Sequence, residues 1–179
     1  MIRIKEKSGF TNMIKRRKFL IWGSLLGIGN CLNAKTIDSF EIRFQKVFVL
    51  IEAVQEVMFP KGTKLPNAKN MHLTQFLYET IIHHSYDKDI RKFVLEGAEE
   101  FLIHEKNFIA YSKSKKERAM RKYEKKRYGK NWLSRIMTLS MEGLFSDPIY
   151  GGNVNEEGWK AIHAFGGYPR PKTRYLQNV

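Results

Sequence analysis

Five histidines and one cysteine are the residues of this chain best suited to metal binding or nucleophilic catalysis. They are His72, His83, His84, His104, His163 and Cys31. A zinc-protease helix carries two histidines four positions apart, with a glutamate directly after the first. His104 and Glu105 begin such a pattern, but Phe108 occupies the position of the second histidine. His83 and His84 are adjacent, and on a helix their side chains would point about 100° apart.

The cysteine and the glycines add no cofactor site to this set. A single cysteine permits no intramolecular disulfide and supplies too few thiolates for an iron–sulfur cluster or a structural zinc site. No glycine-rich loop of the dinucleotide-binding or phosphate-binding type follows a strand pattern. We therefore expect no catalytic residue, no metal site and no cofactor in this chain, and an independent enzyme is the least favoured class of function.

Periodic apolar residues predict the helices that position everything else. Over 38–58 they recur at intervals of four and three, the spacing of one helix face, with Asp38 as a helix N-cap and Pro60 as a stop. The same period marks three further apolar helices. They are expected at 73–81, from 90 to near Asn107, and at 132–145.

A basic helix and an irregular tail complete this outline. Residues 113–127 are almost purely polar, so a surface helix is expected there, with Gly129 closing it. Beyond 148 no periodicity survives, and no alternating strand pattern appears anywhere. The sequence thus predicts a mostly α protein, with a small helical domain over 35–179 whose tail, 146–179, is irregular and glycine-rich.

Positive charge is concentrated in two segments. The 179 residues carry a net charge of +14, of which residues 1–34 contribute +6. The segment 113–130 holds ten basic and two acidic residues and contributes the remaining +8, so the rest of the domain is neutral. Such a run is most often a solvated helix face. Contact with anionic lipid headgroups or with an acidic partner is the alternative.

The first 34 residues have the three-part layout of an export signal. Basic residues at 15–18 precede an apolar segment of 14 residues, 19–32, and Ala34 supplies a small residue at the end. The apolar segment is shorter than the roughly 20 residues needed to cross a bilayer. We therefore assign 1–34 as a signal peptide and 35–179 as the helical domain.

The basic part of this leader resembles a twin-arginine signal, which a translocase reads as an address for folded cargo. Its core is Arg16 and Arg17, followed after one residue by Phe19 and Leu20. An ordinary Sec-type signal with a basic start is the alternative. A lipoprotein signal ending at Cys31 is less well supported, because the preceding asparagine stands where a small residue is normally required.

The tail contains residues that permit an ordered turn and residues that favour an interface. Gly151, Gly152 and Asn153 tolerate positive φ, so a compact turn is expected there. Trp159 and Tyr168 are large amphipathic side chains of the kind that dominate protein interfaces. From the residues alone, packing of these aromatics on their own helices and docking on a partner are equally supported.

These motifs resemble one known family. The chain is similar to subunit 3 (the gamma subunit) of membrane-associated gluconate 2-dehydrogenase and of related flavin-dependent sugar and polyol dehydrogenases. The similarity lies in the leader at 16–20, in the helical middle, and in the tail motifs at 145–153, 158–159 and 165–169. The resemblance covers most of the chain. The tail motifs are specific, whereas the helices are not. The weight of the basic segment 113–130 is not part of the resemblance.

The resemblance implies a non-catalytic subunit. Its partner would be a large flavoprotein of the glucose-methanol-choline oxidoreductase type that carries FAD, with a cytochrome c subunit carrying haem c as electron acceptor in many members. The flavoprotein would travel folded with this chain through the twin-arginine translocase to the periplasm, where the complex associates with the inner membrane. The tail would dock on the flavoprotein through Tyr150, Gly151, Gly152, Asn153, Gly158, Trp159, Gly166 and Tyr168.

A second class of function is binding of nucleic acid or a membrane surface through the basic segment 113–130. Its lysines and arginines could contact phosphates, and Tyr123 and Tyr128 could contact bases. An export signal argues against nucleic acid, so we expect no nucleic-acid partner.

Overall fold

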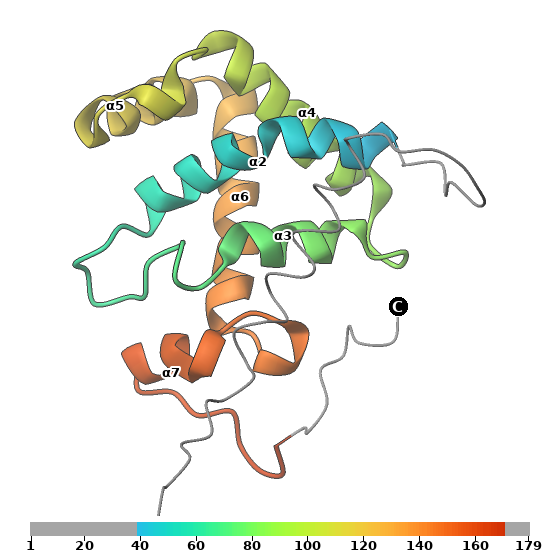
Figure 1. Cartoon of the computed structure of the whole chain (residues 1–179), viewed down its shortest axis with the longest axis vertical. Coiled ribbons are helices and arrows are strands. Elements are labelled where there is room, and N and C mark those ends of the chain that lie inside the picture. Colours follow the sequence, from blue (N-terminus) through green and yellow to red (C-terminus); the bar gives the residue numbers. More distant parts are fainter. Residues whose placement is uncertain (1–38, 171–179) are drawn as a thin grey trace, which may run out of the picture. The chain divides into compact units, whose positions relative to one another are not determined.

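The computed structural model describes residues 39–170, which form six α-helices and three 3-10 turns with no strand among them (Figure 1). The helices are α2 (Ser39–Met58), α3 (Leu73–Ile82), α4 (Lys88–His104), α5 (Lys113–Glu124), α6 (Arg127–Phe145) and α7 (Glu157–Ala161). The turns are η1 (Phe108–Ala110), η2 (Pro148–Tyr150) and η3 (Val154–Glu156). The predicted mostly α fold is confirmed. The predicted leader and the predicted N-cap Asp38 lie outside the described residues.

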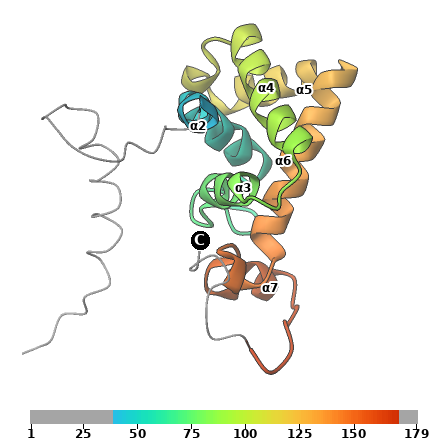
Figure 2. The same ribbon diagram turned by 90° about the vertical axis from the view of Figure 1, so that its right-hand side faces the viewer.

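Helix α6 is the element that organises the others. It contacts each of the other five described helices, and Figure 2 shows it running along α3 and α4. Its predicted apolar face is buried, including Trp132, Ile136 and Leu139. The first predicted face is buried in the same way, since α2 places Phe44, Val47, Ile51 and Val54 in the same core. In the described part of the chain no helix is both long and apolar enough to cross a membrane.

An aromatic cluster joins α4, α5 and α6. Phe101 lies 4.8 Å from Tyr123 and 5.7 Å from Trp132 between ring centroids. The Trp132 indole donates a 3.0 Å hydrogen bond to the Val94 carbonyl. Gly97 makes this approach possible, because a Cβ at that position would collide with the Trp132 ring. Tyr123 thereby fixes the basic helix α5 to the core.

A buried polar chain ties α2, α3 and α6 together. The Thr74 hydroxyl donates to Gln55 Oε1 at 2.7 Å, and the Gln55 amide donates to Ser140 Oγ at 2.9 Å. Ser140 Oγ in turn donates to the Ile136 carbonyl at 2.7 Å. The buried polar side chains of Thr74, Gln55 and Ser140 are therefore hydrogen-bonded to one another, as groups removed from water require.

Several boundaries differ from the sequence prediction, and the largest difference is the start of α6 at Arg127, five residues before the predicted 132. The prediction that Gly129 closes the basic helix is wrong, because α5 ends at Glu124 and Gly129 lies inside α6. Gly129 is buried there, where a Cβ would collide with the Tyr123 carbonyl, so its small size lets α6 start close to the end of α5. Helix α4 begins earlier than expected because Asp87 caps it, accepting hydrogen bonds from the amides of Asp89 and Ile90.

Candidate partner-binding site in the C-terminal tail

The tail starts with a tight reversal after α6. Asp147 accepts a 3.0 Å hydrogen bond from the Ile149 amide, which begins the 3-10 turn η2. Gly151 then adopts φ of 92°, a left-handed conformation that glycine reaches without strain. The chain consequently returns to the end of α6 within six residues, and the predicted compact turn is confirmed.

Gly152 and Asn153 lie directly against helix α6. The Asn153 amide donates a 2.6 Å hydrogen bond to the Gly143 carbonyl. A Cβ at position 152 would collide with that same carbonyl, so only glycine permits this contact. Gly143 is small for a related reason, since a Cβ there would press on Phe76 of α3. Two glycines thus allow the tail backbone to pack on the helix backbone.

Asn153 also holds the following helix in place. Its side chain is fully buried, and its Oδ1 accepts a 2.9 Å hydrogen bond from the Gly158 amide in α7. A Cβ on Gly158 would collide with the Leu144 carbonyl. Asn153 and Gly158 therefore act together as a latch between the tail and the last turn of α6.

Trp159 and Arg170 make contacts that hold the end of the tail against its beginning. The Trp159 indole donates a 2.8 Å hydrogen bond to the Phe145 carbonyl, and the Arg170 guanidinium lies 4.7 Å above the indole ring. Arg170 also pairs with Asp147 at 2.9 Å and with Glu156 at 3.2 Å. Sequence reasoning left out Arg170 and Asp147, because nothing in their local spacing places them beside each other.

A different group of side chains faces solvent. Tyr168 is 82% exposed, Phe165 62% and Tyr150 45%, and the rings of Phe165 and Tyr168 lie 5.0 Å apart. Ile162 is also exposed. Phe165, which the predicted docking set omits, is more exposed than Tyr150. We call Tyr150, Ile162, Phe165 and Tyr168 the tail surface.

The eight predicted docking residues therefore divide into three groups. Tyr150 and Tyr168 belong to the tail surface, whereas Gly152, Asn153 and Gly158 are buried. The remaining three residues support the tail. They are Gly151 at the turn, the half-buried Trp159, and Gly166, where a Cβ would collide with the Trp159 ring. Packing on the chain's own helices therefore applies to Trp159, whereas docking of Tyr168 on a partner stays a prediction.

The histidines gather no further ligands. Within residues 39–170 no group of three or more histidine, cysteine or acidic side chains is close enough to hold a metal ion. The rings of His83 and His84 lie 4.4 Å apart, closer than neighbours on one helix would be. The reason is that α3 ends at Ile82, so this pair is not helical.

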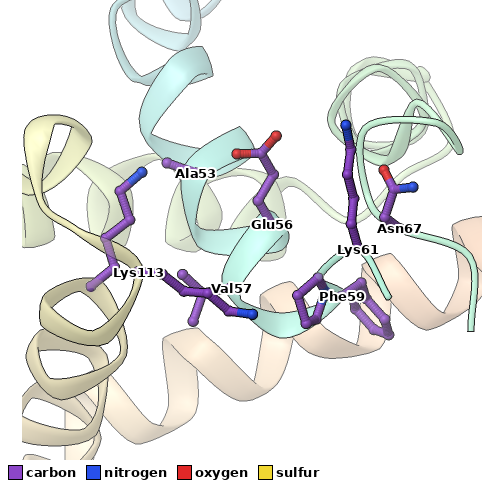
Figure 3. A pocket seen from close by; sticks show the side chains of 9 residues that line it. Ala53, Glu56, Val57, Phe59, Lys61, Asn67 and Lys113 are labelled. Atoms are coloured by element: carbon purple, nitrogen blue, oxygen red, sulfur yellow. The ribbon is translucent and has the colours of Figure 1, made fainter. Parts of the chain in front are cut away.

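A shallow hollow of about 300 Å³ lies where the end of α2 approaches the start of α5 (Figure 3). Lys61, Lys113 and Glu56 place charges around it, while Val57 and Phe59 are apolar. This set contains no nucleophile paired with a base, so it resembles no catalytic site.

Comparison with known proteins supplies the family. A sequence model described as gluconate 2-dehydrogenase subunit 3 matches residues 45–167, well over half of the 179 residues. The chain belongs to the gluconate 2-dehydrogenase subunit 3 family. No curated protein and no solved structure matches it. The region that matches this subunit 3 family includes the latch residues Asn153 and Gly158 and the tail surface up to Phe165.

Proposed function

We propose that this member of the gluconate 2-dehydrogenase subunit 3 family is the export and assembly subunit of its complex. The family assigns the chain to the small subunits of a dehydrogenase. In our proposal it carries a twin-arginine signal at Arg16, Arg17, Phe19 and Leu20 and binds, exports and stabilises an FAD-containing large subunit. The flavin, and haem c where a cytochrome subunit is present, belong to the partner chains, and the assembled complex works in the periplasm at the inner membrane.

The observation that carries this proposal is the tail surface held on an internally fixed support. Exposed aromatic side chains are costly to leave in water and are the residues that most often dominate binding energy at interfaces. Here the Ala164 amide donates a 2.8 Å hydrogen bond to the Trp159 carbonyl before Phe165 and Tyr168, and Arg170 pairs with Asp147 after them, so both ends of this segment are held. A pre-ordered surface loses less conformational entropy on binding, so it supports tight association.

The chain would act by binding rather than by bond-making. The tail surface would bury Tyr168, Phe165 and Tyr150 against the folded flavoprotein in the cytoplasm. The leader would then be read once for the whole complex, so the flavoprotein reaches the periplasm with its flavin already in place.

Capture of the large subunit tests the docking step. We expect F165A/Y168A, made in the full chain and coexpressed with the large subunit, to weaken copurification at least tenfold, because an interface aromatic typically contributes about 2 kcal/mol or more. The matched control is I42A/V49A, which removes two exposed apolar side chains from α2. Equal capture by both double variants and by the unmodified pair would refute docking through the tail surface.

Export is tested separately with the leader. We expect R16K/R17K to abolish periplasmic dehydrogenase activity while the two subunits still copurify from the cytoplasm, because lysine keeps the charge but not the guanidinium groups. K5R/K7R is the charge-neutral control in the same leader. Undiminished periplasmic activity in R16K/R17K would refute the twin-arginine route and leave the docking result unaffected.

A further inference from the structure

Helix α5 carries a one-sided cationic face. Lys115, Arg118, Lys122 and the C-cap residue Lys125 follow one another at intervals of three, four and three, which places them along one side of α5 and its C-terminal end. All four side chains are exposed. We call these four residues the basic stripe.

The acidic residues of the segment lie off this face. Glu117 and Glu124 are seven positions apart, on a different side of the helix, and both line a groove against α6. Glu117 pairs there with Arg121 at 2.8 Å. Among the residues that the structure describes, Arg121 is the one cation of 113–130 within ion-pair distance of a carboxylate. The charge of the basic stripe is therefore not neutralised by its surroundings.

The core holds this face outward. Ala119, Met120 and Tyr123 are the buried residues of α5, and Tyr123 is part of the aromatic cluster with Phe101 and Trp132. These contacts fix the orientation of α5 about its own axis. The backbone that carries the basic stripe is therefore held with this side of the helix toward solvent.

Two exposed isoleucines lie at the end of α4 and in the segment that joins α4 to α5. Ile103, at the end of α4, is 68% exposed, and Ile109, in η1, is 48% exposed. The neighbour of Ile103 is His104, whose Nε2 lies 3.4 Å from Lys126 Nζ at the end of the basic segment. Tyr111 follows Ile109 by two residues, and the centroid of its ring lies 3.8 Å from Lys115 Nζ. The segments that carry Ile103 and Ile109 thus contact basic residues near both ends of α5.

The basic stripe and the tail surface are well separated. Helix α5 leads into the start of α6 and the tail leaves its end, so α5 and α7 lie at the two ends of α6 (Figure 1). A helix of 19 residues spans roughly 28 Å. Binding at one end therefore leaves the other end accessible.

We propose that the basic stripe, with Ile103 and Ile109, binds the surface of an anionic lipid bilayer. Lysine contributes a mobile point charge that suits a fluid layer of headgroups, whereas ordered phosphate recognition favours the fixed fork of arginine. Three of the four stripe residues are lysines. Isoleucine inserts at a headgroup boundary, whereas single-stranded nucleic acid is held by aromatic stacking. Charge and apolar contact together supply the two signals that stable membrane attachment requires.

Vesicle binding of the full chain tests this proposal. The probes are vesicles of phosphatidylcholine alone and of phosphatidylcholine with 30% phosphatidylglycerol, compared by flotation at low and at physiological salt. The variant is K115Q/R118Q/K122Q/K125Q, and the matched control K46Q/K64Q/K69Q/K88Q removes four exposed lysines elsewhere. Since each cation near an anionic surface contributes roughly fivefold, loss of all four should make the stripe variant bind anionic vesicles roughly 600-fold more weakly than the control. I103S/I109S should weaken binding at physiological salt as well.

The leader is identical in all these proteins, so its own lipid affinity cancels in the comparison. Circular dichroism establishes that each variant is folded. Equal losses in the stripe and control variants would overturn the proposal, and so would equal binding to neutral and anionic vesicles. It would also be overturned if the stripe variant lost affinity for duplex DNA or for the large subunit while its vesicle binding stayed unchanged.

Discussion

Substitution of Asn153 by alanine tests whether the tail is held by one buried hydrogen bond. The Asn153 side chain is fully buried, and its Oδ1 accepts from the Gly158 amide at 2.9 Å. Alanine removes this acceptor and leaves the buried amide of Gly158 without a partner, which costs about 1–3 kcal/mol. The Asn153 Nδ2 has no hydrogen-bond partner among the described residues, so its loss adds no cost.

The backbone of residue 153 adds a second cost. Asn153 adopts φ of 44°, and an alanine in this left-handed region is less favourable than asparagine by about 1 kcal/mol. Asn155 provides a matched control, because it has φ of 55° but its side chain is exposed. N155A therefore carries the backbone cost without the buried amide. The difference between N153A and N155A isolates the hydrogen bond.

Native-state hydrogen exchange of the segment 150–162 measures this difference. We expect N153A to lower the protection of the Gly158 and Trp159 amides by a factor of roughly 5 to 150 relative to N155A, which corresponds to about 1–3 kcal/mol. In the same comparison N153A should capture the large subunit less well than N155A. Equal protection in the two variants would refute the role of Asn153 as a latch.

Two further predictions concern the end of the tail and the aromatic cluster. R170Q should make the tail after Ile162 more sensitive to limited proteolysis. R170K should restore only part of the resistance, because lysine cannot contact Asp147, Glu156 and the Trp159 ring at the same time. Equal resistance in R170Q and the unmodified chain would contradict this prediction. Burial raises the pKa of Tyr123 well above its usual value near 10, so the folded state keeps the phenol neutral after the unfolded chain begins to ionise, and stability falls as pH rises above about 10. In urea unfolding, Y123F should remove this part of the decrease in the free energy of unfolding above about pH 10. At pH 7 it should change the free energy of unfolding by less than ~1 kcal/mol, because the buried hydroxyl has no hydrogen-bond partner in the described structure. An unchanged dependence of the free energy of unfolding on pH above about 10 would contradict this prediction.

Helix positions were predictable because they depend on local periodicity. The apolar spacing in 38–58 and 73–81 gives α2 and α3 to within one residue at each end. The end of α5 was not predictable in this way. Gly129 is a helix breaker by local propensity, but here a close approach to Tyr123 makes glycine necessary inside α6.

In the tail, the sequence by itself determined that a compact turn forms and that aromatic side chains accompany it. Glycine and asparagine have intrinsic access to positive φ, and that property needs no knowledge of the rest of the chain. Which aromatics are buried and which are exposed was decided only by the tertiary structure. Trp159 is held because its indole donates to the Phe145 carbonyl at the end of α6 and Arg170 covers its ring, whereas Phe165 and Tyr168 are exposed. These contacts join residues 14 and 11 positions apart, so the local spacing of residues could not predict them.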